Sequence, residues 1–339
     1  MRSRSWVQFA LIFVVTLCGQ RAYAAPIAAP MPAPVTASQA DCGDRSGGWW
    51  RSAYAVDYAA TAVGAGLYFA APSLLDHGAA GIGPIYNPAK PASLLSQPGV
   101  ASVSKPYAEE GAGETVPTLW MGYGLVAGLG YVAVQEALFS PTAAGRWHRT
   151  HDAVVGYLEG LALTLGVMEL LKVGVGRLRP DFLDRARRYH CGNGSGAGFD
   201  CDGVTPLPAD KADWLMSDGR KSFPSGHSAT AAYLATYLSL SVGGRWVWGE
   251  HATARSRVGG ILAQVLLVSG AAFVASSRVT DGRHHLGDVL TGASIGAVFG
   301  SLAYARFFQL NGALRGGRQL RIGVSPTREG SMLTLSGRM

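Results

Sequence analysis

The most chemically suggestive spacing in the chain lies in residues 276–289, SSRVTDGRHHLGDV. His284 and Asp288 are four positions apart, so on a helix that begins by His284 their side chains lie on one face, a turn apart. A carboxylate that accepts a hydrogen bond from one ring nitrogen fixes the imidazole tautomer and leaves the other nitrogen free to attack. Arg278 precedes the pair, and its planar guanidinium suits a tetrahedral oxyanion such as phosphate. This spacing indicates a histidine nucleophile beside an anion site, although a helix cap or a salt bridge would give the same pattern.

A second segment, Pro224-Ser225-Gly226-His227, follows a polar loop and opens a long apolar stretch. Ser225 or Ser222 can cap a helix there, and the first N–H groups of such a helix bind anions. His227 would lie beside the bound anion, where a protonated imidazole can give its proton to a departing alkoxide. A glycine-containing helix entry with an exposed histidine is the alternative interpretation.

A third segment carries Lys172, Arg179 and Pro180. The seven-residue step from Lys172 to Arg179 is two helical turns, so both cations project from one face, and Pro180 limits how far the helix continues. A basic residue near the negative end of a helix dipole would also account for this segment taken alone.

The three segments together supply cations and N–H groups for a phosphate, a nucleophile with its orienting group, and an acid. Their pattern is Lys, six residues, Arg-Pro; then Pro-Ser-Gly-His; then Ser-Arg, five residues, His, three residues, Asp. This pattern resembles the type 2 phosphatidic acid phosphatase superfamily, which includes lipid phosphate phosphatases, class A acid phosphatases and vanadium haloperoxidases. All three motifs match, over roughly residues 150–305. The surrounding sequence is most similar to the lipid phosphate phosphatase branch.

The resemblance implies hydrolysis of lipid phosphate monoesters, phosphatidate-like or lipid pyrophosphates, through a phosphohistidine. It implies catalytic roles for a nucleophile, an acid and an orienting carboxylate: His284, His227 and Asp288. It implies phosphate binding by Lys172, Arg179, Arg278, Ser225 and the backbone N–H of Gly226. It implies no cofactor and no metal, and the sequence has no HExxH, paired CxxC or dense Asp cluster that would indicate a metal. Arg177 and Arg283, close to the motif residues, could extend the anion-binding surface but are interpreted as solvated charges, and His285 as a supporting or surface residue.

Composition narrows the class of protein. Only 15% of the 339 residues are charged, below the quarter or so usual in soluble proteins. The formal net charge of +7 would suit nucleic acid or anionic lipid, but the basic residues are spread over many loops and no nucleic-acid module is present. We therefore expect a lipid phosphate substrate, a membrane and no nucleic acid, and the sequence indicates no protein partner.

Four regions follow from the pattern along the chain. Residues 1–24 read as a secretory signal peptide, and residues 25–50, rich in Ala and Pro, as a disordered tether. Residues 51–310 form the predicted helical phosphatase domain, with its motifs within 172–288. The tail at 311–339 ends in alternating apolar and polar residues that predict a short β-hairpin.

The helical domain is predicted to be an all-α bundle. Its six helices are expected at 52–75, 117–138, 152–176, 226–247, 257–277 and 285–308. The apolar runs at 258–277 and 117–135 approach the roughly 20 residues that a membrane span needs, and those at 228–244 and 289–305 are shorter but acceptable. Three acidic residues interrupt the third helix and should face the interior: Asp152, Glu159 and Glu169.

Loop charges predict how such a bundle would lie in a membrane. Eight arginines fall on one side of a six-span arrangement, which should be cytoplasmic: Arg146, Arg149, Arg245, Arg255, Arg257, Arg306, Arg315 and Arg318. The motifs then face the periplasm from the inner membrane. Cys191 and Cys201, on the same side, could form a disulfide in that oxidising compartment or remain free thiols.

A cleaved signal peptide conflicts with six spans, because it places residue 25 outside and the motifs inside. The first helix, which contains Asp57 and Pro72, would then be interfacial, or the whole body would be soluble in the periplasm. The alternatives are therefore a soluble periplasmic non-specific acid phosphatase and, in poorer agreement with the motif context, a vanadium-dependent haloperoxidase.

Overall fold

The computed structural model describes residues 53–74, 86–87, 90–97, 105–107, 114–139, 143–196, 198–315, 319–327 and 330–338. The predicted signal peptide and tether lie outside these residues. The chain divides into two compact units, one of Asp57–Gly316 and one of Met1–Val56 together with Gly317–Met339.

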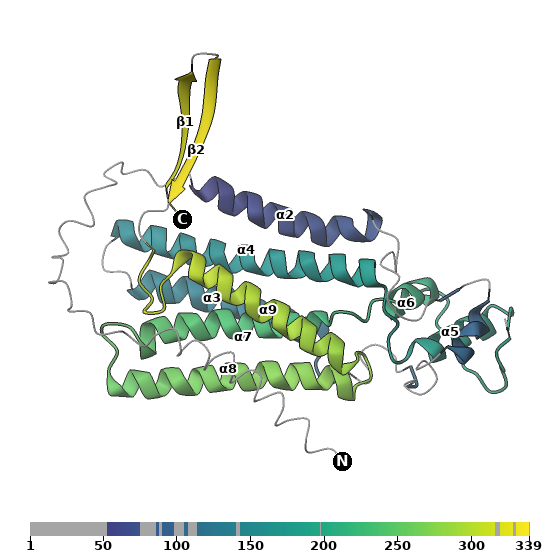
Figure 1. Cartoon of the computed structure of the whole chain (residues 1–339). Coiled ribbons are helices and arrows are strands. Elements are labelled where there is room, and N and C mark those ends of the chain that lie inside the picture. The colour runs from purple at the N-terminus through teal and green to yellow at the C-terminus, as the bar shows by residue number, and fades with distance from the viewer. Residues whose placement is uncertain are drawn as a thin grey trace. The chain divides into compact units, whose positions relative to one another are not determined.

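Six long helices account for most of the larger unit (Figure 1). They are α2 (Ala53–Leu74), α3 (Thr118–Phe139), α4 (Ala143–Val175), α7 (Gly226–Val242), α8 (Ala254–Thr280) and α9 (Leu286–Phe307). Each corresponds to one predicted helix, and the all-α class is confirmed. The largest difference is at α4, which begins at Ala143, whereas the predicted helix began at residue 152. The prediction started too late because the first turns of α4 are polar and lack an apolar stripe.

Helix α7 is the centre of the bundle. It contacts α3, α4, α8 and α9, and every residue from Ser228 to Val242 except Leu234 is buried. Its buried tyrosines are hydrogen-bonded, as interior polar groups must be: the hydroxyl of Tyr237 donates to the carbonyl of Ala153 at 2.9 Å.

Helix α9 lies directly against α7 because three glycines face it. A Cβ atom at Gly292 would overlap the backbone of Ser225, and one at Gly296 would overlap the carbonyl of Ala229. At Gly300 a Cβ would lie 3.0 Å from the carbonyl oxygen of Tyr233. The two helices therefore approach at backbone distance, which brings their N-termini together.

Two short helices that the sequence did not predict, α5 (Phe182–Gly192) and α6 (Ala212–Gly219), lie at one end of the long helices (Figure 1). The 3-10 helix η1 (Pro91–Ser96) packs there too, and its Leu94 is buried with Phe182 and Met216. Helices α5 and α6 are only 11 and 8 residues long and lie in a stretch rich in polar residues and glycine, so they do not stand out from it in the sequence.

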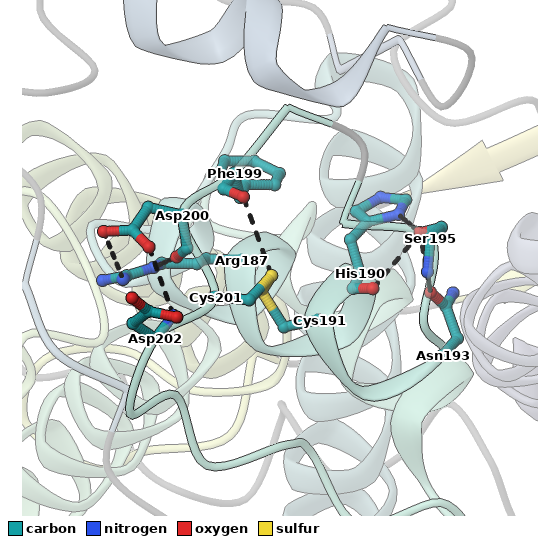
Figure 2. Close-up of a disulfide and its surroundings, with 9 residues drawn as sticks. All are labelled: Arg187, His190, Cys191, Asn193, Ser195, Phe199, Asp200, Cys201 and Asp202. Atoms are coloured by element: carbon teal, nitrogen blue, oxygen red, sulfur yellow. Dashed lines mark hydrogen bonds and ion pairs between the residues drawn. A yellow bond between two sulfur atoms is a disulfide. The ribbon is translucent and has the colours of Figure 1, made fainter.

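Cys191 at the end of α5 forms a disulfide with Cys201 (S–S 1.96 Å), which closes the intervening loop (Figure 2). A hydrogen bond of 2.6 Å from Nε of Arg187 to the carbonyl oxygen of Asp200 ties the same loop back to α5. The loop is thus fixed to α5 by a covalent bond and by a polar contact.

The smaller unit contains the predicted β-hairpin. Strands β1 (Gln319–Thr327) and β2 (Gly330–Arg338) pair antiparallel, with Gln319 opposite Arg338 and Thr327 opposite Gly330.

Three helices among the described residues are long and apolar enough to cross a membrane. They are Arg146–Val175 within α4, Ala254–Thr280 and Leu286–Phe307. The predicted spans at 117–135 and 228–244 are not in this set, since α3 contains polar residues near its end and α7 has only 17 residues. The acidic residues of α4 face the interior as predicted, and Asp152, Glu159 and Glu169 are 5%, 3% and 8% exposed.

Candidate active site

The three motifs meet where the ends of four helices converge, toward α5 and α6 in Figure 1. Lys172 lies in the last turn of α4 and Arg278 in the last turn of α8. Ser225 is the N-cap of α7, and Asp288 lies in the first turn of α9. A hydrogen bond of 3.0 Å from the Ser225 N–H to the Asp288 carbonyl joins the starts of α7 and α9.

The start of α7 forms an anion-binding end. Ser225 Oγ accepts hydrogen bonds from Ser228 N (3.5 Å) and Ser228 Oγ (2.9 Å), so Ser225 rather than Ser222 caps the helix. A Cβ at Gly226 would lie 3.2 Å from Nζ of Lys172, so the lysine ammonium reaches the first residue of α7. The helix N–H groups and this cation therefore face the same space.

His284 presents one ring nitrogen for chemistry. Its Nδ1 lies 2.6 Å from the carbonyl oxygen of Ser222. A carbonyl only accepts hydrogen bonds, so Nδ1 carries the proton and Nε2 keeps its lone pair. Burial, and after it the charge of Arg179, hold the pKa of His284 well below its ordinary value. The ring is therefore neutral at neutral pH, as a nucleophile must be.

Asp288 does not contact His284 in the way that the four-residue spacing predicts. The distance from Asp288 Oδ2 to His284 Nδ1 is 3.9 Å, which is too long for a hydrogen bond. Oδ2 instead accepts from the hydroxyl of Ser222 at 2.6 Å and from the N–H of His285 at 3.0 Å. Asp288 therefore holds the serine whose carbonyl orients the histidine.

Each cation of the motifs has a carboxylate beside it. Lys172 Nζ lies 3.3 Å from Glu169, and Arg179 Nη2 lies 2.7 Å from Asp218. Arg278 Nη2 lies 3.1 Å from Asp281. These carboxylates orient the cations and offset part of their charge in a mostly buried site.

His227 shares this site. Its Nε2 lies 3.4 Å from the hydroxyl of Thr118. Burial lowers the pKa of His227 to about 3, and the charges of Arg278, Lys172, Arg179 and Arg283 contribute in that order. Arg179, Lys172 and His227 also lower the pKa of His284. Both histidines and the cations thus act on one another at short range.

The interpretation of Arg177 and Arg283 as solvated charges is wrong. Arg177 Nη1 donates to the buried Asp288 at 2.8 Å. The side chain of Arg283 is 3% exposed, and its Nε lies 3.5 Å from Glu114. Neither pairing has a local sequence signal, because the partners lie far away in the chain.

Comparison with known proteins identifies the family of the region that carries the motifs. A family model described as the PAP2 superfamily matches residues 153–311, which include all three motifs. These residues belong to the PAP2 superfamily. The resemblance indicated by the motifs is thereby confirmed.

Relatives of the PAP2 region carry phosphatase names. A putative phosphatidate phosphatase of Drosophila melanogaster is 32% identical over 152 residues, or 42% of this chain and 38% of that protein. Phospholipid phosphatase 2 of Homo sapiens is 32% identical over 181 residues, 52% of this chain and 58% of that protein. Lipid phosphate phosphatase 2 of Arabidopsis thaliana is 32% identical over 158 residues, 47% of this chain and 51% of that protein. The chain thus spans from 38% to 58% of the length of these curated relatives.

Proposed function

We propose that this PAP2 protein is a metal-independent phosphatase that hydrolyses lipid phosphate esters through a phosphohistidine on His284. The observation that carries the proposal is the 2.6 Å hydrogen bond from Nδ1 of His284 to Ser222, which leaves Nε2 as a neutral nucleophile among cations. A site that bound phosphate without hydrolysing an ester would need the cations but not an oriented, neutral histidine.

In the first step Nε2 of His284 attacks phosphorus, and the bond from phosphorus to the ester oxygen breaks. His227 is protonated once the bound phosphate dianion offsets the neighbouring cations and raises the pKa of the ring, and it gives this proton to the departing alkoxide, so the alcohol leaves neutral. Lys172, Arg179, Arg278 and the N–H groups at the start of α7 stabilise the charge on the phosphoryl oxygens.

In the second step water attacks the phosphohistidine, and the bond between phosphorus and Nε2 breaks. His227, now neutral, accepts a proton from that water, and inorganic phosphate leaves. The atoms balance with one water consumed for each ester hydrolysed, and both histidines return to their starting states.

The lipid substrate and the location belong to the same proposal. The phosphatase names of the relatives and the three apolar helices support a membrane-bound substrate. The disulfide between Cys191 and Cys201 supports an oxidising compartment, and we place the active site on the periplasmic side of the inner membrane behind a cleaved signal peptide.

The test compares two leaving groups in one experiment. Purified protein in detergent with a metal chelator is assayed on phosphatidate and on an aryl phosphate whose phenolate leaves without protonation. The His227→Ala variant should lose about 10²–10⁴-fold in rate on phosphatidate and much less on the aryl ester. The His284→Ala variant should lose activity on both, and trapping of a phosphoenzyme should fail.

The matched control is His251→Ala, since His251 is exposed between α7 and α8. Full activity of His284→Ala in folded protein would refute the mechanism. If the protein hydrolyses the aryl ester but not phosphatidate, the proposed lipid substrate is excluded and the proposed phosphatase activity stands.

A further inference from the structure

A strap of residues 114–118 reaches the active site from outside the region that the family model matches. Thr115 donates to Asp281 from both its N–H (2.9 Å) and its hydroxyl (2.7 Å). The carbonyl oxygen of Val116 accepts from Nη2 of Arg278 at 2.9 Å. The strap is thus fixed to the third motif by several hydrogen bonds.

The strap carries an acid toward two cations. Oε1 of Glu114 lies 3.8 Å from Nη1 of Arg278 and 3.5 Å from Nε of Arg283. The two arginine side chains are 1% and 3% exposed, and that of Glu114 is 14% exposed. One carboxylate therefore serves two buried guanidinium groups.

Arg278 has one nitrogen, Nη1, left for a phosphate, and Glu114 lies 3.8 Å from it. Nη2 of Arg278 is already bonded to Val116 and Asp281, and Nε lies 3.3 Å from Ser277 Oγ. Nη1 remains as the donor for a phosphoryl oxygen. An anion that binds Nη1 must therefore approach the carboxylate of Glu114, and like charges repel strongly where water is excluded.

Glu114 is held less tightly than the other carboxylates of the site. Asp218 accepts from Arg179 at 2.7 Å and from Arg185 at 3.1 Å, and Asp281 accepts two hydrogen bonds from Thr115. The distances from Glu114 to its arginines, 3.5 and 3.8 Å, are those of an ion pair without a short hydrogen bond. Among the described residues, displacing Glu114 therefore breaks no short hydrogen bond to an arginine of the site.

We propose that Glu114 is a displaceable counter-ion that competes with the phosphoryl group for Arg278 and Arg283. It stabilises the two arginines between turnovers and lowers the affinity of the site for phosphate. Weaker product binding follows, so inorganic phosphate leaves more readily. The inference rests on the proposed function only for the identity of the substrate.

The test measures binding rather than catalysis. Titration calorimetry with inorganic phosphate and with orthovanadate is run on the full chain in detergent, for wild type, Glu114→Gln and Glu250→Gln. Glu250 is an exposed carboxylate in the turn between α7 and α8, so its substitution changes the net charge by the same amount. Glu114→Gln should lower the Kd of both anions about tenfold, and Glu250→Gln should leave it unchanged.

Three results would overturn the proposal: unchanged or weaker anion binding in Glu114→Gln, an equal gain in Glu250→Gln, or no anion binding in any of these proteins. Glu114→Asp keeps the charge and should bind anions like wild type, and Glu114→Ala replaces Glu114→Gln if the latter does not fold.

Turnover separates this inference from the proposed function. If the protein is a phosphatase, Glu114→Gln should lower KM and strengthen inhibition by inorganic phosphate, whereas a purely positioning role would lower kcat with KM unchanged. If Glu114→Gln binds anions more tightly but no variant, nor the wild type, turns over substrate, the counter-ion role of Glu114 is supported and the proposed phosphatase activity is refuted.

Discussion

Nδ1 of His284 donates to the carbonyl oxygen of Ser222 across a 2.6 Å hydrogen bond that joins residues 62 positions apart. A backbone atom, which no substitution can remove, thus sets the tautomer of His284. The hydroxyl of the same serine is bonded to Asp288, so the carboxylate acts on the histidine through the position of a loop.

This arrangement predicts graded effects on activity. Ser222→Ala should lower kcat about tenfold, because the carbonyl remains but loses one of its anchors. Asp288→Ala should lower it about a hundredfold, because the bonds of the carboxylate to Ser222, His285 and Arg177 are lost together. KM should change little in either variant. Ser294→Ala, at an exposed serine on α9, is the control, and equal kcat values for Ser222→Ala and wild type would contradict the role of the loop.

The contact between α7 and α9 predicts a strong effect of one methyl group. Gly296→Ala places a Cβ against the carbonyl of Ala229, so the two helices must separate, and we expect a loss of about 3 kcal/mol in the free energy of unfolding together with most activity. Gly270→Ala is the matched control, since a Cβ there meets nothing within 4 Å. Denaturation in detergent measures both, and similar stabilities would show that α9 can shift freely.

Anion binding should be coupled to proton uptake. Without an anion, burial and four nearby cations lower the pKa of His227 to about 3, and a bound dianion offsets those charges and raises it again. At pH 6, binding of sulfate, which stays doubly charged, should therefore take up protons. Calorimetry in two buffers of different ionisation enthalpy measures the uptake, which His227→Gln should abolish; an enthalpy independent of the buffer would mean that His227 stays neutral.

Stability should fall on acidification, partly through His284. The pKa of His284 is lowered by burial and by Arg179. In acid, His284 is therefore protonated in the unfolded chain but stays neutral in the folded protein. This stability is complete above the unfolded pKa of about 6.5 and is lost as the pH falls toward the folded value, by about 2 kcal/mol at pH 5. Melting temperatures at pH 7.5 and pH 5 should therefore differ less for His284→Gln than for wild type, and an equal difference would speak against a neutral buried ring.

The six long helices could be predicted because apolar runs bounded by polar loops are a local property of the sequence. The chemistry of phosphate transfer requires certain residue types at fixed spacing within each motif, and the residues predicted on that ground lie together at one end of the bundle; their roles stay predictions. The short helices α5 and α6 were missed, since they are only 11 and 8 residues long and lie in a stretch rich in polar residues and glycine, although α5 buries Phe182, Ala186 and His190 at helical spacing.

Contacts between polar groups that lie far apart in the chain could not be predicted from the sequence either. Ser222 with His284, Arg177 with Asp288 and Glu114 with Arg283 are joined only by the fold. Spacing assigned the orienting role to Asp288 directly, because a helix face is the sole geometry that a four-residue step reveals. Which backbone carbonyl would reach the histidine depends on a loop of another helix.

The glycines at 292, 296 and 300 also fix how far α9 lies along the axis of α7. They recur every four residues, so the α7 backbone fits against α9 at one register only, and a slip by one residue would move the helix about 1.5 Å along its axis. A misplacement of about 1 Å can cost a hundredfold in rate. The distance between His284 before α9 and the N–H groups at the start of α7 is thus set by glycines that lie up to about four turns away and carry no functional group.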